Sequence, residues 1–357
     1  MHGLCPPAKA AGHHTGFRMA AGGPTGSNMK NRRGFVSGLG GIAIASTVGT
    51  TLGSLSLSAS AEGVSRLLVG FPAGATGDRI ARAVAPSLAA SLGTSVIVEN
   101  RAGAAGQLAI EVVKNAPADG TMLLQTIGSS MVIYPHTYKG LRYRPFEDFV
   151  PVGTVATVPI VLVAPLNTPA KNLAEMSALL KRDQKHGFFG TPAAGSVFHF
   201  SGVLLQRALH SGFDHVAYKG SAPLLQDILS GQVPFGFMAQ SDILEHYRAG
   251  KLQILAVTGT SRTTQLPEVP TFAELGYTNL VNREWFSYFL AANTPPEAVA
   301  KYRLAVRRAV ASEEVRKKLL DAGLEMAEGD PAVLAATMQK EFGQWQKIVK
   351  EIGFVAD

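Results

Sequence analysis

Short apolar runs alternate with segments of helical periodicity along the first third of the chain. The apolar run 66–71 is followed by a loop rich in glycine, and apolar residues then recur every four positions from Ile80 to Leu92. A short apolar run bounded by Pro and Gly predicts a buried strand, whereas a spacing of four predicts a helix. Further buried strands are expected at 96–98 and 122–126. This alternation predicts a parallel sheet wound by right-handed crossovers.

A second series of the same kind begins near residue 158, and a helical tail follows it. Strands are expected at 158–165, 186–193, 213–220, 233–239 and 251–259, and helices at 171–181, 195–210, 221–231 and 242–250. The tail has helical patterns at 297–311, 313–322 and 331–352. Trp285 and Phe286, just before the tail, either line the hinge or fill a core, and we favour the core because aromatic residues near such crossings mostly serve packing.

The tail determines the expected domain organisation. Because it carries no strand pattern, it has to pack on a sheet formed earlier, most simply the first one. The chain would then cross twice between two α/β domains, near 159–163 and near 286–290. We expect domain I to comprise residues 62–160 and 286–357, and domain II residues 161–285. This is the layout of a hinged receptor with its site in the cleft.

The N-terminal 61 residues have the features of an export signal. Arg32 and Arg33 precede an uncharged run that ends in a small-x-small pattern at Ala61, the expected cleavage position. A membrane anchor is disfavoured because Gly, Ser and Thr dilute the apolar run. The paired arginines resemble a twin-arginine signal. Met29 lies just ahead of them and is the expected translation start, so residues 1–28 are expected to be an extension upstream of the true start. This extension and the signal together exclude residues 1–61 from the fold.

Charge and cysteine content exclude several classes of protein. The formal charge of +7 falls to +2 for residues 62–357, because the first 61 residues carry five basic residues and no acidic one. With no basic cluster and no interleaved aromatic platform, nucleic-acid binding is not expected. The only cysteine, Cys5, lies upstream of the signal, so the exported chain has no disulfide and no cysteine metal ligand.

Candidate binding residues follow the expected strands. In open α/β sheets, ligands bind beyond the carboxyl ends of the strands, where helix N-termini favour anions. The stretches "FPAGATGD" (71–78), "IGSS" (127–130) and "TPAAGSVFH" (191–199) occupy such positions. The alternatives are local: Asp78 caps a helix, the serines at 129–130 do likewise, and His199 is solvated or locally bonded. Tyr218 and Lys219 either face the cleft or lie at its rim.

Common catalytic motifs are missing. The chain has no Gly-x-Ser-x-Gly elbow, no His-Glu-x-x-His, no phosphate-binding Gly-x-x-x-x-Gly-Lys-Ser/Thr, and no dinucleotide fingerprint after a strand. This shifts the expectation from an enzyme to a binding protein, with no catalytic residue, no cofactor and no metal.

Several stretches in a fixed order resemble the substrate-binding receptors of tripartite tricarboxylate transporters, the Bug family. They cover most of residues 64–357 and read "FPAGATGD", "VENRAGAAG", "APADG", "EDFVPVG", "AYKGSAPLLQDILSGQV", "AGKLQILAVT" and "LPEVPTFAELGY", with a later Trp and a Pro-Pro turn. The resemblance implies a two-domain α/β periplasmic-binding protein of the Venus flytrap, type II-like architecture. It also implies a small carboxylate as ligand and no catalysis.

The resemblance also implies a set of ligand-binding residues. They are Phe71, Ala73, Gly74, Asp78 and Ser129 from the first domain, and Ala194, Gly195, Ser196, His199, Tyr218 and Met238 from the second. The chain departs from the family pattern at Ala75, where a second glycine is usual, and at Thr76-Gly77, where Pro-Thr is usual. Met238 replaces an acidic residue, which argues against an amino-acid ligand and favours a more apolar or aromatic carboxylate. It is equally consistent with neutral packing.

The resulting expectation is a monomeric periplasmic receptor that delivers a small organic carboxylate to a membrane permease. Two alternatives remain open from the sequence. One is a carboxylate sensor that acts on a signalling partner, and the other is a periplasmic enzyme.

Overall fold

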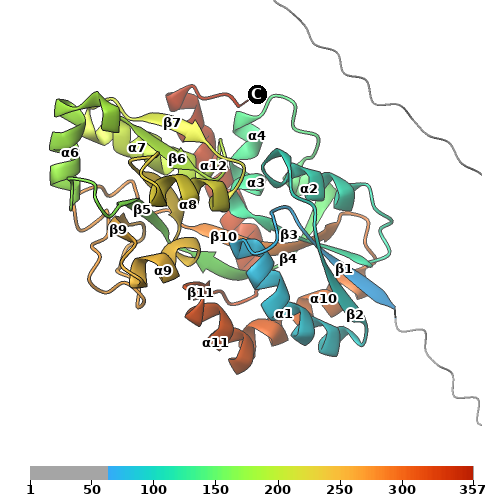
Figure 1. Cartoon of the computed structure of the whole chain (residues 1–357). Helices are drawn as coiled ribbons and strands as arrows, with labels where there is room; N and C mark the ends of the chain where they lie inside the picture. Colours follow the sequence, from blue (N-terminus) through green and yellow to red (C-terminus); the bar gives the residue numbers. More distant parts are fainter. Residues whose placement is uncertain (1–62, 357) are drawn as a thin grey trace, which may run out of the picture. The chain divides into compact units, whose positions relative to one another are not determined.

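The computed structural model describes residues 63–356 (Figure 1). The predicted export signal, its cleavage near Ala61, the start at Met29 and Cys5 all fall outside these residues. Within them, no helix combines the length and the apolar character needed to cross a membrane.

The structure has two sheets, and the first is a six-stranded mixed sheet. Its order is β11-β4-β10-β3-β1-β2, with β1 at Val64–Val69, β2 at Ser95–Asn100, β3 at Met122–Ile127, β4 at Phe149–Val158, β10 at Glu284–Ala291 and β11 at Glu325–Met326. Strand β1 pairs in parallel with β2 and β3, but β10 runs antiparallel to β3 and β4, and β11 antiparallel to β4. The prediction of a parallel sheet is therefore confirmed for β1, β2 and β3. Strand β4 runs in the same direction as these three, whereas β10 and β11 run in the opposite direction.

Two of these strands differ from the sequence-based expectation. Strand β4 was not expected, because Pro151 and Gly153 interrupt its apolar pattern, and the register between β10 and β4 shifts near both of them. Strand β2 was expected to be buried, yet it is an edge strand in which the side chain of Ile97 is 52% exposed.

A five-stranded sheet forms the second half, in the order β7-β6-β8-β5-β9. Its strands are β5 at Ile160–Pro165, β6 at Phe188–Thr191, β7 at Asp214–Ala217, β8 at Gly236–Ala239 and β9 at Leu252–Val257. Strand β6 is parallel to β7 and β8, whereas β5 is antiparallel to β8 and β9. The expectation of a parallel sheet is wrong for β5 because this strand enters from the other sheet without a crossover helix.

Helices surround both sheets. They are α1 at Thr76–Leu92, α2 at Gln107–Lys114, α3 at Gly128–Val132, α4 at Tyr134–Thr137, α5 at Pro145–Asp148, α6 at Leu173–Arg182, α7 at Val197–Leu209, α8 at Ser221–Leu229, α9 at Gln240–Arg248, α10 at Pro296–Ala311, α11 at Glu313–Asp321 and α12 at Pro331–Ile352. Helices α10 and α12 pack on β4, so the tail covers the first sheet as expected (Figure 1). The expectation that the tail has no strand is wrong, because the two-residue strand β11, too short to give a pattern, lies between α11 and α12 and pairs with β4.

We call the part around the six-stranded sheet (63–158 and 284–356) the first lobe, and the part around the five-stranded sheet (160–257) the second lobe. Only Pro159 separates β4 from β5, and the segment 258–283 leads back to β10. Glu284 already pairs with Val158 in the first sheet, just before the predicted domain limit after residue 285. The domain limits themselves stay a prediction.

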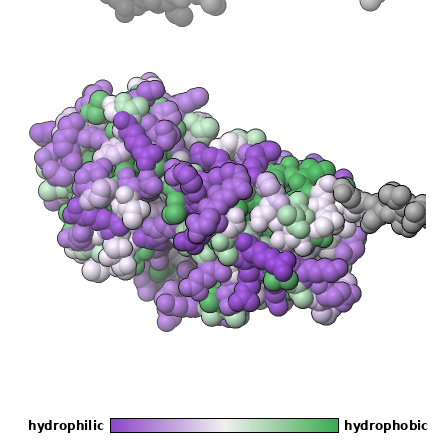
Figure 2. Space-filling model, turned by 90° about the horizontal axis from the view of Figure 1, so that it is seen from below, coloured by the Kyte–Doolittle hydropathy of each residue, from purple (hydrophilic) through white to green (hydrophobic). Residues whose placement is uncertain are grey.

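One large hydrophobic core runs through both lobes. It joins Leu67 and Phe289 of the first sheet to Phe189 and Phe237 of the second, and a smaller core lies between the second sheet and its helices. The face of the molecule in Figure 2 is mostly hydrophilic, with hydrophobic residues gathered only in small groups. Burial of apolar side chains thus stabilises the two lobes together.

Candidate functional site

Two connected pockets open where strand-end loops of the two lobes meet. The inner pocket has about 470 Å³ of empty space, part of which is open to solvent, and is lined mainly by apolar side chains, including Phe71, Ile127, Phe198 and Phe286. The outer pocket has about 1560 Å³ of empty space, part of which is open to solvent, and is lined largely by glycine and alanine, with Tyr138, Tyr218 and Lys219. Phe71, Pro72, Pro192, Ala193 and Gly220 line both pockets, which together form one cleft.

Three helices begin at the wall of the inner pocket. The lining includes Thr76 at the start of α1, Ser221 at the start of α8, and Ala239 just before α9. None of these three helices has a side-chain hydrogen bond at its N-cap. The first N–H of α9 donates to the Pro159 carbonyl oxygen over 3.0 Å, but no side chain caps any of the three helices. N–H groups at such helix starts bind anions because they point along the positive end of the helix dipole.

Charged side chains are scarce in the cleft. Asp242 is the one charged residue that lines the inner pocket, and Lys219, which is exposed, is the one that lines the outer pocket. The cleft therefore offers backbone donors and apolar surface in place of an arginine clamp.

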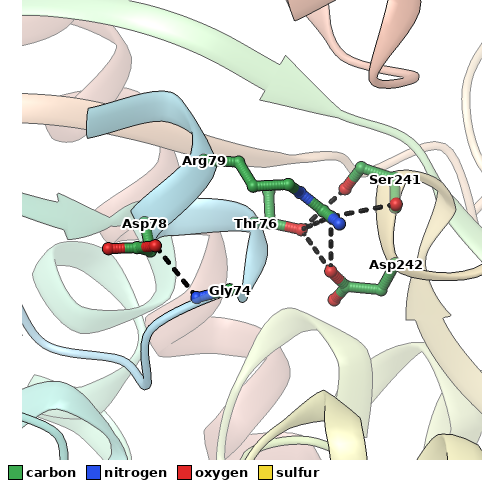
Figure 3. Close-up of polar contacts among 6 residues, drawn as sticks. All are labelled: Gly74, Thr76, Asp78, Arg79, Ser241 and Asp242. Atoms are coloured by element: carbon green, nitrogen blue, oxygen red, sulfur yellow. Dashed lines mark hydrogen bonds and ion pairs between the residues drawn. The ribbon is translucent and has the colours of Figure 1, made fainter. Parts of the chain in front are cut away.

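A polar cluster joins the lobes beside the inner pocket (Figure 3). The Thr76 hydroxyl donates to Asp242 Oδ1 over 2.7 Å and lies 2.7 Å from the Ser241 hydroxyl. Since the single hydroxyl proton of Thr76 goes to Asp242, Ser241 is the donor in the second contact. Arg79 Nη2 donates to Asp242 Oδ1 over 2.8 Å and to the Ser241 carbonyl oxygen over 2.9 Å. We call Thr76, Arg79, Ser241 and Asp242 the interlobe cluster.

A second interlobe connection surrounds a buried carboxyl group. Both the backbone N–H and the hydroxyl of Ser129 donate to Glu284, and the Ser129 hydroxyl accepts from the backbone N–H of Val197 at the start of α7 over 3.0 Å. Burial raises the pKa of Glu284 to about 7, against the opposing effect of hydrogen bonds from Ser129 and Trp285. The chain Glu284–Ser129–Val197 thus links α3 of the first lobe to α7 of the second.

Residues 80–354 match the family model described as "Tripartite tricarboxylate transporter family receptor". The chain belongs to this receptor family. Protein BugT of Bordetella pertussis (strain Tohama I) is 32% identical to this receptor over 289 residues, which cover 81% of the chain and 89% of BugT.

Solved structures agree with the family assignment. The structure of periplasmic binding protein BugD has a TM-score of 0.76 and 28% identity, covering 82% of this receptor and 99% of BugD. A protein of R. palustris with adipate has a TM-score of 0.77 and 30% identity, covering 82% of this receptor and 97% of that chain. The receptor thus has the two-domain α/β Venus flytrap fold expected from the sequence, with two sheets and the cleft between them.

Three of the expected ligand-binding residues of this receptor line the cleft. Phe71 lines both pockets, while Ala194 and Tyr218 line the outer one. The Tyr218 hydroxyl donates to Asp227 over 2.6 Å, and burial together with this bond raises the pKa of Tyr218 to about 12. Ala73 is an exposed residue of the β1–α1 loop and lines neither pocket.

Asp78 is engaged within its own loop. Its carboxylate accepts from the Gly74 N–H over 2.9 Å and from Arg82 Nε over 2.9 and 3.0 Å (Figure 3 shows the Gly74 bond). Although burial acts in the opposite direction, the hydrogen bonds from Arg82 and Gly74 keep the pKa of Asp78 below its usual value. Asp78 therefore fixes the conformation of the loop, and Gly74 adopts a positive φ of 81° within it.

The expected donors near the start of α7 are also engaged locally. The fully buried Ser196 hydroxyl donates to the Ala193 carbonyl oxygen over 2.7 Å, and the Gly195 N–H donates to His199 Nδ1 over 3.2 Å. The His199 ring stacks on His215 with centroids 3.8 Å apart. Burial, with a smaller effect of His215, lowers the pKa of His199 to about 3, so the ring is neutral near pH 7.

Ser129 and Met238 lie away from the cleft pockets. Ser129 lines a separate small pocket next to Glu284, and Met238 is fully buried in the smaller hydrophobic core on β8. The ligand contacts assigned to these residues stay a prediction.

Sequence reasoning missed several residues that the structure brings to the cleft. Ile127 and Phe198 lie within the candidate stretches 127–130 and 191–199 but were not singled out, and Ala239 was not selected at all; all three line the inner pocket. Phe286, for which a core position was favoured over the hinge, is both in the core and at the pocket wall. Their only sequence signal is proximity to a strand end, because an apolar side chain at a pocket wall has the same pattern as one in a core.

Proposed function

We propose that the protein is a periplasmic receptor that binds one small organic carboxylate between its lobes and passes it to the permease of a tripartite tricarboxylate transporter. The observation that carries this proposal is the convergence of three helix starts without side-chain caps, those of α1, α8 and α9, on the inner pocket. Helix N-termini of this kind attract carboxylates. The related R. palustris protein with adipate supports the same ligand chemistry.

Binding would be coupled to closure because the donors come from both lobes. Helix α1 belongs to the first lobe, whereas α8 and α9 belong to the second, so a carboxylate between them draws the lobes together. Charge-assisted hydrogen bonds are strong in a cleft shielded from water. The interlobe cluster stabilises the same closed arrangement, and the closed form would be recognised by the permease.

The receptor would release its ligand unchanged. It acts in this proposal as a monomer, without cofactor or metal, after export and removal of residues 1–61. Membership of a receptor family supports a role in binding without catalysis.

Native mass spectrometry of the purified protein, before and after unfolding, tests the proposal. We expect a small carboxylate that leaves when the protein unfolds, or, for an empty protein, saturable one-to-one binding of a carboxylate in calorimetry. Conversion of an added carboxylate to a product, or the absence of binding across mono-, di- and tricarboxylates, would contradict the proposal.

A further inference from the structure

Three phenylalanine rings from both lobes surround the inner pocket. Phe71 follows β1, Phe286 lies on β10, and Phe198 lies in the first turn of α7. The aromatic pairs of residues 63–356 include none of these three rings, although they include the neighbouring core rings Phe189, Phe200 and Phe237. The three rings therefore line the pocket without an aromatic partner of their own.

The charge pattern of the inner pocket disfavours a second carboxylate. Asp242 lies in its wall with a side chain only 8% exposed, and both Thr76 and Arg79 already bond to its Oδ1 atom. Arg79 offsets part of the Asp242 charge but lines neither pocket, so a second anion in the inner pocket would lie near Asp242 without a cation of its own. Burying an unpaired charge beside a like charge is unfavourable, because a partly buried site screens it poorly.

The favourable position for one carboxylate is the boundary between the pockets. Gly220 lines both pockets at the start of α8, and the neighbouring Lys219 lines the outer one. The Gly220 N–H itself donates to the Pro192 carbonyl oxygen, and Pro223 has no N–H, so an anion there would meet the N–H groups of Ser221 and Ala222 and the one lysine of the cleft. The rest of the ligand would extend toward the phenylalanines.

We infer that the ligand is a monocarboxylate with an apolar body, aromatic or branched aliphatic, which fills the inner pocket against Phe71, Phe198 and Phe286. This inference rests on the proposed receptor function and specifies its ligand class. It is independent of Met238, which is buried in a core. Rings from both lobes would contact the same apolar body, so its burial would also favour closure.

Calorimetry with two sets of probes tests the inference. Benzoate, cyclohexanecarboxylate and 4-methylpentanoate represent apolar monocarboxylates, and malate, adipate and citrate represent polycarboxylates. We expect the best monocarboxylate to bind about tenfold or more tightly than the best polycarboxylate. If a polycarboxylate binds more tightly, the inference is overturned and the receptor function stands. If no probe of either set binds, the receptor function fails, and the inference fails with it.

Two phenylalanines of α7 provide a matched pair of variants. Phe198 lines the inner pocket, whereas Phe200, two residues further on, is fully buried against Trp345. Phe198→Leu should weaken monocarboxylate binding about tenfold, and Phe200→Leu should lower thermal stability with little change in affinity. Equal affinity losses in the two variants would contradict the assigned role of the inner pocket.

Asp242→Asn tests whether the negative charge of Asp242 excludes a second carboxylate from the inner pocket. Because Asp242→Asn also leaves the Arg79 cation without its partner, the substitution is made in an Arg79→Leu background and compared with Arg79→Leu alone. The quantity to compare is the ratio of adipate to benzoate affinity, in which a common effect on closure cancels. The ratio should rise about tenfold. An unchanged ratio would show that Asp242 does not exclude the second carboxylate and would overturn this step.

Discussion

The hydroxyl of Thr76 donates a hydrogen bond to the carboxylate of Asp242 over 2.7 Å, although 166 positions separate the two residues in the chain. Thr76 opens helix α1 of the first lobe, and Asp242 lies in the first turn of α9 of the second. The contact therefore exists only while the lobes are together. Arg79 reinforces it without lining either pocket of the cleft.

Removal of Arg79 should accelerate ligand release. In Arg79→Leu, the nearly buried Asp242 carboxylate loses its cationic partner, which destabilises the closed form by about 1–2 kcal/mol after allowance for the partial exposure of Arg79. We expect dissociation about tenfold faster in stopped-flow measurements. Arg262→Leu is the matched control. It also removes an arginine from an ion pair, but Arg262 and Glu274 both lie in the segment 258–283, so no Thr76–Asp242 or Arg79–Asp242 contact is lost. Equal rates in both variants would mean that the cluster does not hold the cleft closed.

A substitution of Gly74 should impair binding more than stability. Gly74 has φ of 81° and open space where a Cβ atom would lie, so Gly74→Val introduces backbone strain of about 1–2 kcal/mol rather than a clash. Relief of this strain would break the Gly74 bond to Asp78 and displace the β1–α1 loop. We expect affinity to fall about tenfold or more while the protein stays folded.

Gly231 offers a control for this strain. It has nearly the same φ, 79°, and equally open surroundings, but it follows α8 and lines neither pocket. Gly231→Val should lower the melting temperature about as much as Gly74→Val does. The affinity for the carboxylate ligand, measured by calorimetry, should stay that of the wild type. A comparable affinity loss at both positions would refute the role of the β1–α1 loop.

The buried Glu284 should make stability depend on pH. Its pKa is raised from 4.5 to about 7, so the folded state binds more protons than the unfolded state between these values. Its stabilising contribution is present below about pH 4.5 and is lost as the pH rises to 7, by about 3 kcal/mol. Glu284→Gln should remove this loss, which urea unfolding at a series of pH values measures.

The comparison has to be made between wild type and variant at each pH, because other buried groups also titrate. Burial lowers the pKa of His215 to about 4 and, with the effect of His215, that of His199 to about 3, so both destabilise the fold as the pH falls below 6.5. If the difference between wild type and Glu284→Gln is constant from pH 5 to pH 8, Glu284 does not titrate in this range.

The same two histidines give a direct spectroscopic prediction. Because both rings are neutral well below pH 6, their imidazole NMR resonances should not titrate between about pH 5.5 and pH 8. The resonances of each histidine can be assigned because they disappear from the spectrum of a variant in which that histidine is replaced. A midpoint near 6.5 for either residue would place it in contact with water and contradict the stacked pair.

The sequence predicted individual elements better than the way they pair. Helices α10 to α12 begin and end within one residue of expectation, because their apolar spacing is regular and Pro and Gly bound them. The antiparallel direction of β10 and β5 was missed, since an apolar run has the same pattern in either direction. Strand β4 was missed because Pro151 and Gly153 interrupt its pattern.

The candidate site was predicted at the level of loops and less well at the level of side chains. Phe71, Ala194 and Tyr218 line the cleft because they follow strands whose carboxyl ends meet there. Asp78, Ser196 and His199 have nearer partners in their own loops, and spacing alone does not show which partner a polar group chooses. Phe198 and Phe286 were missed as pocket residues because their burial pattern is that of a core.

The position of β10 in the first sheet sets the order in which the chain can fold. Strand β4 lies between β10 and β11, and both neighbours come from the last quarter of the sequence. A nascent chain that ends before Glu284 has β4 without a neighbouring strand on either side, whereas every strand of the second sheet is already present. The strands of the second sheet can therefore pair during synthesis, but the first sheet requires nearly the whole chain, as does the core that the lobes share. A truncated product would leave unpaired strand edges open to aggregation.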